Sequence, residues 1–469
     1  MATLSQIELL SSSQAAELSQ VEKRRYEAAV SKSESRNLAL WGILMSSVFV
    51  ASVFRIAAVF QYNPLEVLIT DPGRWWEAAT HLSNIQPIHA IDAPGYPLWL
   101  ALFIQIAGSS ATAIALHNSA LSIITPWMWH RLVRELTDDR DLALAGWAIF
   151  SWLPSWISIY SYTMSETLFL PLLGAALWCS VRTYKSDSSR SYLGSALLWA
   201  AASATRVFAL PVSLACLLWT IRPHGKRVAE TRVGSKLAYA VFAFAIVAVP
   251  LSIRAHHILK VWDPFGFPRM NQIYMESGRK SLRFNISRDS GAYVWGYEFG
   301  SPSLYQEPLS PVSHWISSRD GITSFSINED NGRSDWDQAL QRYRASFRQK
   351  LRIWSENYVM FMFAPSWPDN NPGRFWDHAA IWLRWCWLPL AIWVIGMNIR
   401  LRKQLGTGMT GLVALVTTAA WTLTPLLPAV MEGRYRKPIE GLLIVNLLLL
   451  VQCSKSRRMT RRAPVARHG

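Results

Sequence analysis

The chain has 469 residues, of which 51% are hydrophobic and only 17% are charged, and it contains 24 tryptophans. This composition is too apolar for an ordinary soluble enzyme, so it favours a membrane protein. The net charge of +16 would suggest nucleic-acid binding in a soluble protein, but it is also typical of a membrane protein with basic cytoplasmic loops, and the location of the charge decides between the two.

The first 38 residues are polar and basic, and they contain no apolar run followed by a cleavage site. We therefore interpret residues 1–38 as a polar tail on the cytoplasmic side and not as a signal peptide. The four cysteines all lie in apolar runs without a C-x-x-C pair, which argues against a zinc site and against a disulfide framework.

Apolar runs of membrane-spanning length recur along the chain and predict an all-α integral membrane protein with about ten transmembrane helices. Two consecutive runs are short, and we expect them to form two helices joined on the outer side around Arg206. The expected spans are 39–60, 112–132, 142–160, 165–184, 191–204, 206–221, 235–254, 378–399, 408–428 and 438–453.

Every second loop between these spans is basic. The first outer segment, 61–94, contains only Arg74, whereas lysines and arginines gather at 131–140, 182–190, 222–236, 400–403 and after 454. The positive-inside rule then places both termini in the cytoplasm. The same alternation explains the net charge without nucleic acid, because basic residues beside a membrane usually meet anionic lipid.

These patterns divide the chain into five parts. A segment as long as 255–377 is too long for a simple connection, so we expect a large, partly folded extracytoplasmic domain there. The parts are the tail 1–38, a membrane module 39–254 that includes the first outer loop 61–111, the domain 255–377, the C-terminal transmembrane helices 378–453, and a basic cytoplasmic tail 454–469.

The first outer loop predicts two helices that lie along the membrane surface. "DPGRWWEAATHL" begins with Asp71 and Pro72, which suit a helix N-cap and first position. Trp75 and Trp76 then fall on an interfacial helix, with their rings expected at headgroup level. The apolar run 91–108 is broken by prolines and suits a second surface helix better than a span.

Five motifs, in order, resemble those of GT-C glycosyltransferases, in the branch that contains protein O-mannosyltransferases and bacterial aminoarabinose transferases. The first outer loop supplies the acid, the aromatic residue and the alanine of the family pattern, followed by its second helix. The motifs are Asp71 with Trp75, Ala79 and the helix 94–108; "YTMSETLFL" at 162–170; "SATRVFALP" at 203–211; "VPLSIRAHHILK" at 249–260; and "MEGRYRKPIEGLLIVNLLLL" at 431–450.

The resemblance implies an inverting hexosyl- or pentosyltransferase that uses a polyprenyl-phosphate-linked sugar as donor and an acceptor outside the cytoplasm. Asp71 would be the catalytic base. Glu166 would be a second catalytic residue that holds a donor-sugar hydroxyl or a metal, or else half of a structural ion pair with Arg206 or Arg434. The protein would lie in the plasma (inner) membrane if it is bacterial, with its active site facing outside. Because Pro72 stands where the family often has a second acid, the sugar stays open.

A cationic cluster at the outer end of a span could bind the leaving phosphate, because guanidinium groups match phosphate geometry. Snorkelling toward the interface is the alternative explanation for such residues. The expected phosphate-binding residues are Arg206, Arg434, Arg436 and Lys437, and the expected substrate-binding residues are Asp92, Tyr96, His117 and Tyr435.

Two of these substrate-binding residues also have a simpler explanation. Asp92 suits the Pro-Gly turn that follows it, and His117 suits the interior of a helix bundle. No metal-binding residues and no certain cofactor are assigned, and a divalent metal is left open.

Two other functions compete with sugar transfer. One is a transporter or flippase of lipid-linked glycan, and the other is a ligase or polymerase of polysaccharide. A transporter would place its acids and bases in the middle of its spans, whereas here the informative charges lie at outer ends. The expected partners are therefore a polyprenyl-phosphate sugar, an extracytoplasmic lipid, glycan or protein acceptor, and membrane lipids, with no nucleic acid.

Overall fold

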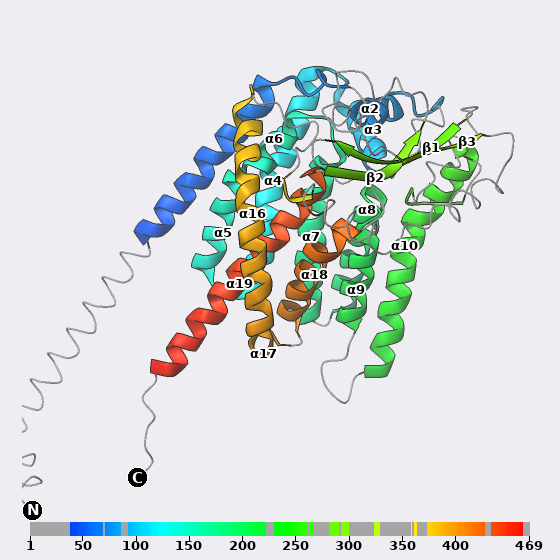
Figure 1. The fold of residues 1–469 in the computed structure, drawn as a ribbon. Helices are drawn as coiled ribbons and strands as arrows, with labels where there is room; N and C mark the ends of the chain where they lie inside the picture. The colour runs from blue at the N-terminus through cyan, green and yellow to red at the C-terminus, as the bar shows by residue number, and fades with distance from the viewer. Residues whose placement is uncertain are drawn as a thin grey trace, which may run out of the picture.

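Each predicted span overlaps one or more helices of the computed structural model (Figure 1). The structure describes residues 38–68, 71–85, 92–186, 188–221, 229–259, 262–266, 281–289, 292–299, 323–328, 358, 361–363, 373–406, 408–426 and 433–462. The helices at the spans are Leu38–Gln61, α4 (Ala111–Thr137), α5 (Arg140–Trp152) with α6 (Pro154–Ser158) and η2 (Ile159–Ser161), α7 (Ser165–Ser186), α8 (Ser189–Thr205), α9 (Ala209–Ile221), α10 (Ala229–Leu259), α16 (Phe375–Arg400), α18 (Met409–Leu423) and α19 (Lys437–Arg462).

Four of the described helices are both long and apolar enough to cross a membrane: Leu38–Gln61, Val233–Ile258, Phe375–Arg400 and Gly433–Ser456. The pair Arg140–Trp152 and Pro154–Ser161, bent by 56°, would make a fifth if it is one span. The chain is therefore an integral membrane protein, while ten crossings stay a prediction. Length is one reason, because α9 has 13 residues and α18 has 15, and a helix needs about 20 to cross the hydrocarbon core.

The bend after α5 is stabilised by a buried arginine that the sequence analysis did not single out. Pro154 starts α6 and cannot continue the hydrogen bonding of α5. Arg55, on the first helix, donates from Nε to the carbonyl of Ser151 at 2.7 Å and from Nη2 to that of Phe150 at 2.8 Å. Arg55 thus supplies hydrogen-bond donors to carbonyl groups at the end of α5, where an apolar environment offers no water to do so.

The first outer loop forms the two predicted helices, α2 (Asp71–Thr80) and α3 (Gly95–Ala107). They lie together at one end of the helix bundle, opposite α17 (Arg402–Leu405) and the end of α19 (Figure 1). Trp75 is buried and packs edge-on against Tyr96, with ring centroids 5.5 Å apart. Trp75 therefore lies inside the protein, where α3 covers the face of α2 that carries it, and its expected position at headgroup level stays a prediction.

Gly95 brings α3 against the end of α8. A Cβ atom at this position would lie 2.7 Å from the backbone of Ala204 and Thr205, which is closer than any side chain allows. Only glycine permits this approach of two backbones. The Pro-Gly turn before α3 therefore sets the position of the first outer loop relative to Arg206, the residue that ends α8.

Part of the large outer segment is a sheet, so the all-α class holds for the membrane helices but not for 255–377. Strands β1 (Ser281–Asp289), β2 (Ala292–Phe299) and β3 (Thr323–Asn328) pair antiparallel in the order β2-β1-β3. In the register, Phe284 is opposite Tyr297 and Phe325. Aromatic and β-branched residues are common in these strands and favour pairing. Residues 1–37 of the predicted tail and much of the predicted domain 255–377 lie outside the described residues.

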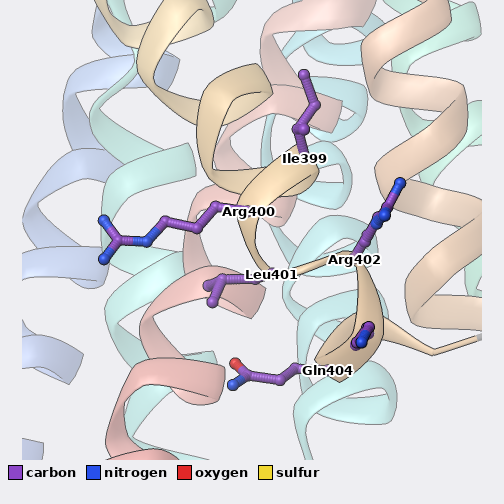
Figure 2. Close-up of a pocket in the computed structure, with 6 residues that line it drawn as sticks. Ile399, Arg400, Leu401, Arg402 and Gln404 are labelled. Atoms are coloured by element: carbon purple, nitrogen blue, oxygen red, sulfur yellow. The ribbon is translucent and has the colours of Figure 1, made fainter.

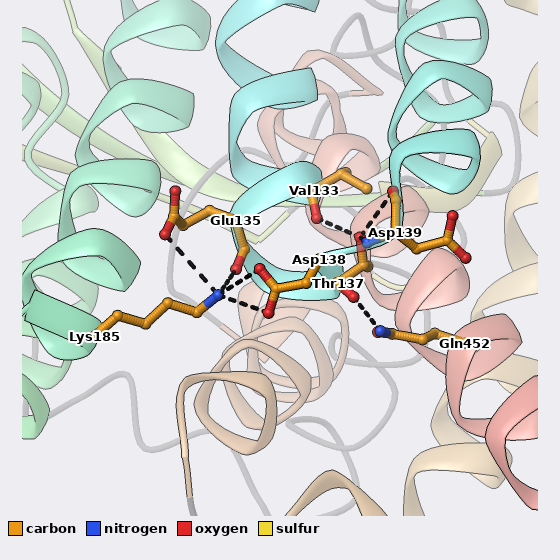
Figure 3. Close-up of polar contacts among 7 residues, drawn as sticks. All are labelled: Val133, Glu135, Thr137, Asp138, Asp139, Lys185 and Gln452. Atoms are coloured by element: carbon orange, nitrogen blue, oxygen red, sulfur yellow. Dashed lines mark hydrogen bonds and ion pairs between the residues drawn. The ribbon is translucent and has the colours of Figure 1, made fainter. Parts of the chain in front are cut away.

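The end of the bundle opposite α2 and α3 is joined by polar contacts around the turn between α4 and α5 (Figure 3). Lys185 of α7 contacts Asp138 with an Nζ–Oδ1 distance of 2.9 Å, and Lys455 of α19 contacts Asp139 at 3.2 Å. Gln452 donates to the carbonyl of Thr137. These contacts connect three helices at the end where the sequence predicts the cytoplasm.

The core between α4, α6 and α19 is packed around two tryptophans. Trp129 and Trp156 are fully buried with ring centroids 5.3 Å apart. A Cβ atom at Gly441 would lie 2.7 Å from the ring of Trp129. We expect Gly441→Ala to lower the free energy of unfolding by about 1–3 kcal/mol because the ring cannot yield, measured as a lower melting temperature in detergent.

The matched control is Gly194→Ala in α8, where an added Cβ meets nothing within 4 Å. This variant should be neutral or slightly more stable, because alanine is favoured over glycine in a helix by about 1 kcal/mol. Equal melting temperatures for the two variants would contradict the tight contact between Gly441 and Trp129.

Candidate active site

Asp71, the first residue of α2, contacts two guanidinium groups. Its Oδ2 lies 2.5 Å from Nη1 of Arg434, and its Oδ1 contacts Nη2 of Arg74, one turn along the same helix. The Asp71 side chain is 16% exposed and that of Arg434 is 9% exposed. The carboxylate at the start of the first outer loop thus pairs with a cation from the last part of the chain.

Asp92 joins the same group of charges through Arg74. The Nε of Arg74 lies 2.9 Å from Oδ2 of Asp92, so one guanidinium bridges two carboxylates. Asp92 precedes the turn into α3, and Gly266, in the left-handed backbone conformation, packs against Asp92 and Ala93 from the other side. Asp92 is therefore part of the site, although a turn residue was the simpler expectation.

Glu166 and Arg206 form a second ion pair, with 2.9 Å between Oε1 and Nη1. Glu166 lies in the first turn of α7 and is fully buried, and Arg206 directly follows α8 with its side chain 10% exposed. A buried carboxylate needs such a partner, because an isolated charge in a low-dielectric interior is strongly disfavoured. The pair joins two of the motifs that carry the family resemblance.

Tyr435 connects the two ion pairs. The centre of its ring lies 5.4 Å from the guanidinium carbon of Arg434 and 5.8 Å from that of Arg206. Both distances are within the range of cation–π contacts. Tyr435 belongs to the short helix η5 (Gly433–Arg436), so η5 places one arginine on Asp71 and an aromatic ring beside the other pair. Asp71, Glu166, Arg206 and Arg434 thus converge on one region.

Tyr96 lies between the helices that carry these charges. It is completely buried, and its hydroxyl lies beside Thr167 and Glu166. Burial raises the pKa of Tyr96 above its ordinary value, although the nearby Thr167 hydroxyl opposes this rise. At neutral pH Tyr96 is therefore a neutral hydroxyl on the Glu166 side of the site.

The charges around Asp71 hold it in the ionised form. Burial disfavours the charged carboxylate, but the positive charges of Arg434 and Arg74 outweigh burial and keep the pKa of Asp71 well below its ordinary range. Asp71 is thus a carboxylate at any physiological pH. With both oxygens beside guanidinium groups, however, it is a weak proton acceptor in this arrangement.

Three of the sequence-predicted residues lie apart from this group and have partners of their own. Arg436 contacts Glu440 with an Nε–Oε1 distance of 2.9 Å and donates to the carbonyl of Phe361 at 2.7 Å. Lys437 donates to the carbonyl of Ser155 at 3.2 Å. His117 accepts from the indole of Trp99 at 2.8 Å, between α3 and α4.

Sequence reasoning missed several residues that hold the site in place. Ser155 donates to Glu440 at 2.5 Å and thus ties α6 to the start of α19. The spacing of Arg436 and Glu440, four residues apart, is a signal for a helical ion pair that could have been read. Arg374, which contacts Glu66 at 2.8 Å, had no local signal, because its partner comes from a distant segment.

No group of three histidine, cysteine, aspartate or glutamate side chains suited to a metal ion occurs among the residues that the structure describes. Arg74 contacts both Asp71 and Asp92 and lies between them. The chemistry that the site offers through its own side chains is therefore a carboxylate next to several fixed cations.

A surface pocket lies at the C-terminal end of α16 (Figure 2). It is lined by Ile399, Arg400, Leu401, Arg402, Lys403 and Gln404. Its lining is basic and carries no acid. Juxtamembrane basic residues of this kind meet anionic headgroups, so the pocket agrees with the cytoplasmic location predicted for 400–403 and has no part in the site at Asp71.

Residues 90–253 match the family described as dolichyl-phosphate-mannose-protein mannosyltransferase. The matched part contains Asp92, Tyr96, His117, Glu166 and Arg206, whereas Asp71 and Arg434 lie outside it. Over this part, the match confirms the resemblance to GT-C glycosyltransferases of the protein O-mannosyltransferase branch.

A solved structure of the Archaeoglobus fulgidus oligosaccharyltransferase, tethered with an acceptor peptide, aligns with a TM-score of 0.47 and 9% identity. The alignment covers 90% of this chain and 50% of that one, so this chain spans half the length of the structure it matches. No curated protein matches in sequence.

Proposed function

We propose that the protein is a membrane glycosyltransferase that moves one sugar from a polyprenyl-phosphate donor to an acceptor hydroxyl outside the cytoplasm. The observation that carries this proposal is the contact of Asp71 with Arg434, which is linked through Tyr435 to the pair of Arg206 and Glu166. The proposed base thus lies beside the two arginines that we propose to bind the phosphate. The family match over residues 90–253 supports the same reaction class.

In the proposed reaction, Asp71 takes the proton of the acceptor hydroxyl as the hydroxyl oxygen attacks the anomeric carbon of the sugar. A new carbon–oxygen bond forms as the bond from that carbon to the phosphate oxygen breaks, and the polyprenyl phosphate leaves with the electron pair. Attack from the side opposite to the leaving group inverts the anomeric configuration. Arg434 and Arg206 stabilise the negative charge that develops on the phosphate.

The other site residues receive supporting roles. Glu166 holds Arg206 in position, and the buried hydroxyl of Tyr96 lies beside Glu166. Asp92 holds Arg74, and Tyr435 separates the two arginines. We assign Arg436 and Lys437 to fixing η5 on α19 and α6, since Arg436 contacts Glu440 and Lys437 contacts Ser155, and His117 to the contact between α3 and α4.

Transfer by the purified protein in lipid vesicles tests this function. Polyprenyl-phosphate mannose with a radioactive sugar is supplied together with a membrane extract as the source of acceptor, and a nucleotide sugar is the control donor. We expect radioactivity to pass to an acceptor from the lipid donor alone. If the sugar stays on its lipid while the lipid exchanges between leaflets, the protein is a flippase and the proposal fails.

The proposed orientation has its own test. In a variant without the four native cysteines, Ser303→Cys should react with a membrane-impermeant maleimide added outside intact cells, whereas Thr407→Cys should react only after permeabilisation. The reason is the alternation of basic loops, which places 255–377 outside and the loop after 400–403 inside. The reverse pattern of labelling would place Asp71 on the cytoplasmic side and contradict an outward-facing active site.

A further inference from the structure

Asp71 and the three charged residues joined to it by ion pairs have no net charge together. Asp71 and Asp92 each carry one negative charge, and Arg74 and Arg434 each carry one positive charge, with contacts that run from Arg434 to Asp71 to Arg74 to Asp92. A carboxylate whose two oxygens both contact guanidinium groups holds its electron pairs in those contacts, so it accepts a proton poorly. The arrangement thus holds the proposed base in an inactive state.

The two arginines differ in how firmly they are fixed to Asp71. Arg74 lies three residues along the same helix and is also held by Asp92. Arg434 comes from η5, and its guanidinium lies against the ring of Tyr435, whose other neighbour is Arg206. Arg434 is therefore paired with Asp71 and also lies near Arg206, the second arginine that we propose to bind the donor phosphate.

From this geometry, and on the basis of the proposed function, we infer that the donor phosphate and Asp71 compete for Arg434, so that Asp71 becomes an active base only when the donor is bound. When the phosphate takes Arg434, the remaining group of Asp71, Arg74 and Asp92 has one net negative charge. Asp71 then has a free oxygen for the acceptor proton, while Arg74 still orients it. No bond to carbon forms or breaks in this exchange.

The exchange predicts that loss of a site residue increases the affinity for the donor phosphate, whereas such a loss ordinarily decreases it. If Arg434 must leave Asp71 before it can bind phosphate, removal of the Asp71 charge should make phosphate binding tighter. We expect Asp71→Asn to lower the Kd for sugar-free polyprenyl phosphate by roughly 5–20-fold, the usual size of coupling between two interacting sites. Binding is measured in nanodiscs by the quenching of intrinsic tryptophan fluorescence or by native mass spectrometry.

A matched control separates exchange from simple repulsion between the carboxylate and the phosphate. Asp92→Asn removes an equal charge from the same group, but Asp92 contacts Arg74 and not the cation that binds the phosphate. Under exchange, Asp92→Asn should change the Kd by no more than about 2-fold. Under repulsion alone, both substitutions should tighten binding to a similar extent, which would overturn the inference.

A double substitution tests whether the effect of Asp71→Asn depends on Arg434. In an Arg434→Gln background, Asp71→Asn should no longer tighten binding of polyprenyl phosphate, because the guanidinium for which Asp71 and the phosphate compete is absent. A gain that persists in this background contradicts the exchange. If the parent protein does not bind polyprenyl phosphate, the proposed donor class fails and the inference with it; if the parent binds and Asp71→Asn leaves the Kd unchanged, the inference alone fails.

Discussion

Asp71→Asn is expected to reduce sugar transfer by roughly 10²–10⁴-fold, the usual loss when a general base is removed. The substitution keeps the shape of the side chain, and asparagine starts a helix about as well as aspartate does. An amide has no charge with which to accept the acceptor proton. The melting temperature should fall, because the largely buried Arg434 loses the negative charge of its partner. Initial rates of transfer at saturating donor, compared below the melting temperature of the variant, measure the loss.

The result also decides between the two roles that the sequence leaves open for Asp71. A residue that only begins α2 would tolerate asparagine, and the variant would transfer sugar at nearly the parent rate. That outcome would remove Asp71 from the mechanism and direct the search for the base to Glu166 or Asp92. Tighter binding of polyprenyl phosphate together with lost transfer would instead agree with both proposals.

Arg206→Met is expected to lower the free energy of unfolding by about 3–5 kcal/mol, because it leaves the fully buried carboxylate of Glu166 without its partner. Methionine retains much of the length of the side chain, so the lost charge dominates the effect. Thermal or denaturant unfolding in detergent measures the change.

The double variant Arg206→Met with Glu166→Leu separates folding from function. Replacing both members of a buried ion pair by apolar residues of similar volume is often neutral or stabilising, so stability should return to near the parent value. Transfer should stay low, because the phosphate has lost one of its two proposed cations. A double variant that is stable and fully active would restrict the pair to a structural role and remove Arg206 from the phosphate site.

The sequence by itself determined the helices, because their signals are local. Apolar runs and basic loops are recognised within a window of one span, and each predicted span overlaps one or more helices. Asp71 at the head of the first outer loop was also predictable, since a proline and a helical spacing of tryptophans follow it. The strands at 281–328 were not predicted, although their aromatic and β-branched residues are a local strand signal.

Only the tertiary structure decided which charges meet. The spacing of Arg436 and Glu440 is a local signal for their ion pair, but no local signal assigns Arg434 to Asp71. Two residues apart on a 3₁₀ helix, Arg434 and Arg436 point in different directions. One therefore reaches Asp71, and the other reaches Glu440. The pairing of Asp71 with Arg434 depends on how α2 and η5 are placed by everything between them, including the close approach of Gly95 to the end of α8. Local periodicity does not predict such contacts, because they depend on the packing of the whole chain. Packing removes these charges from water, and buried charges must then be paired.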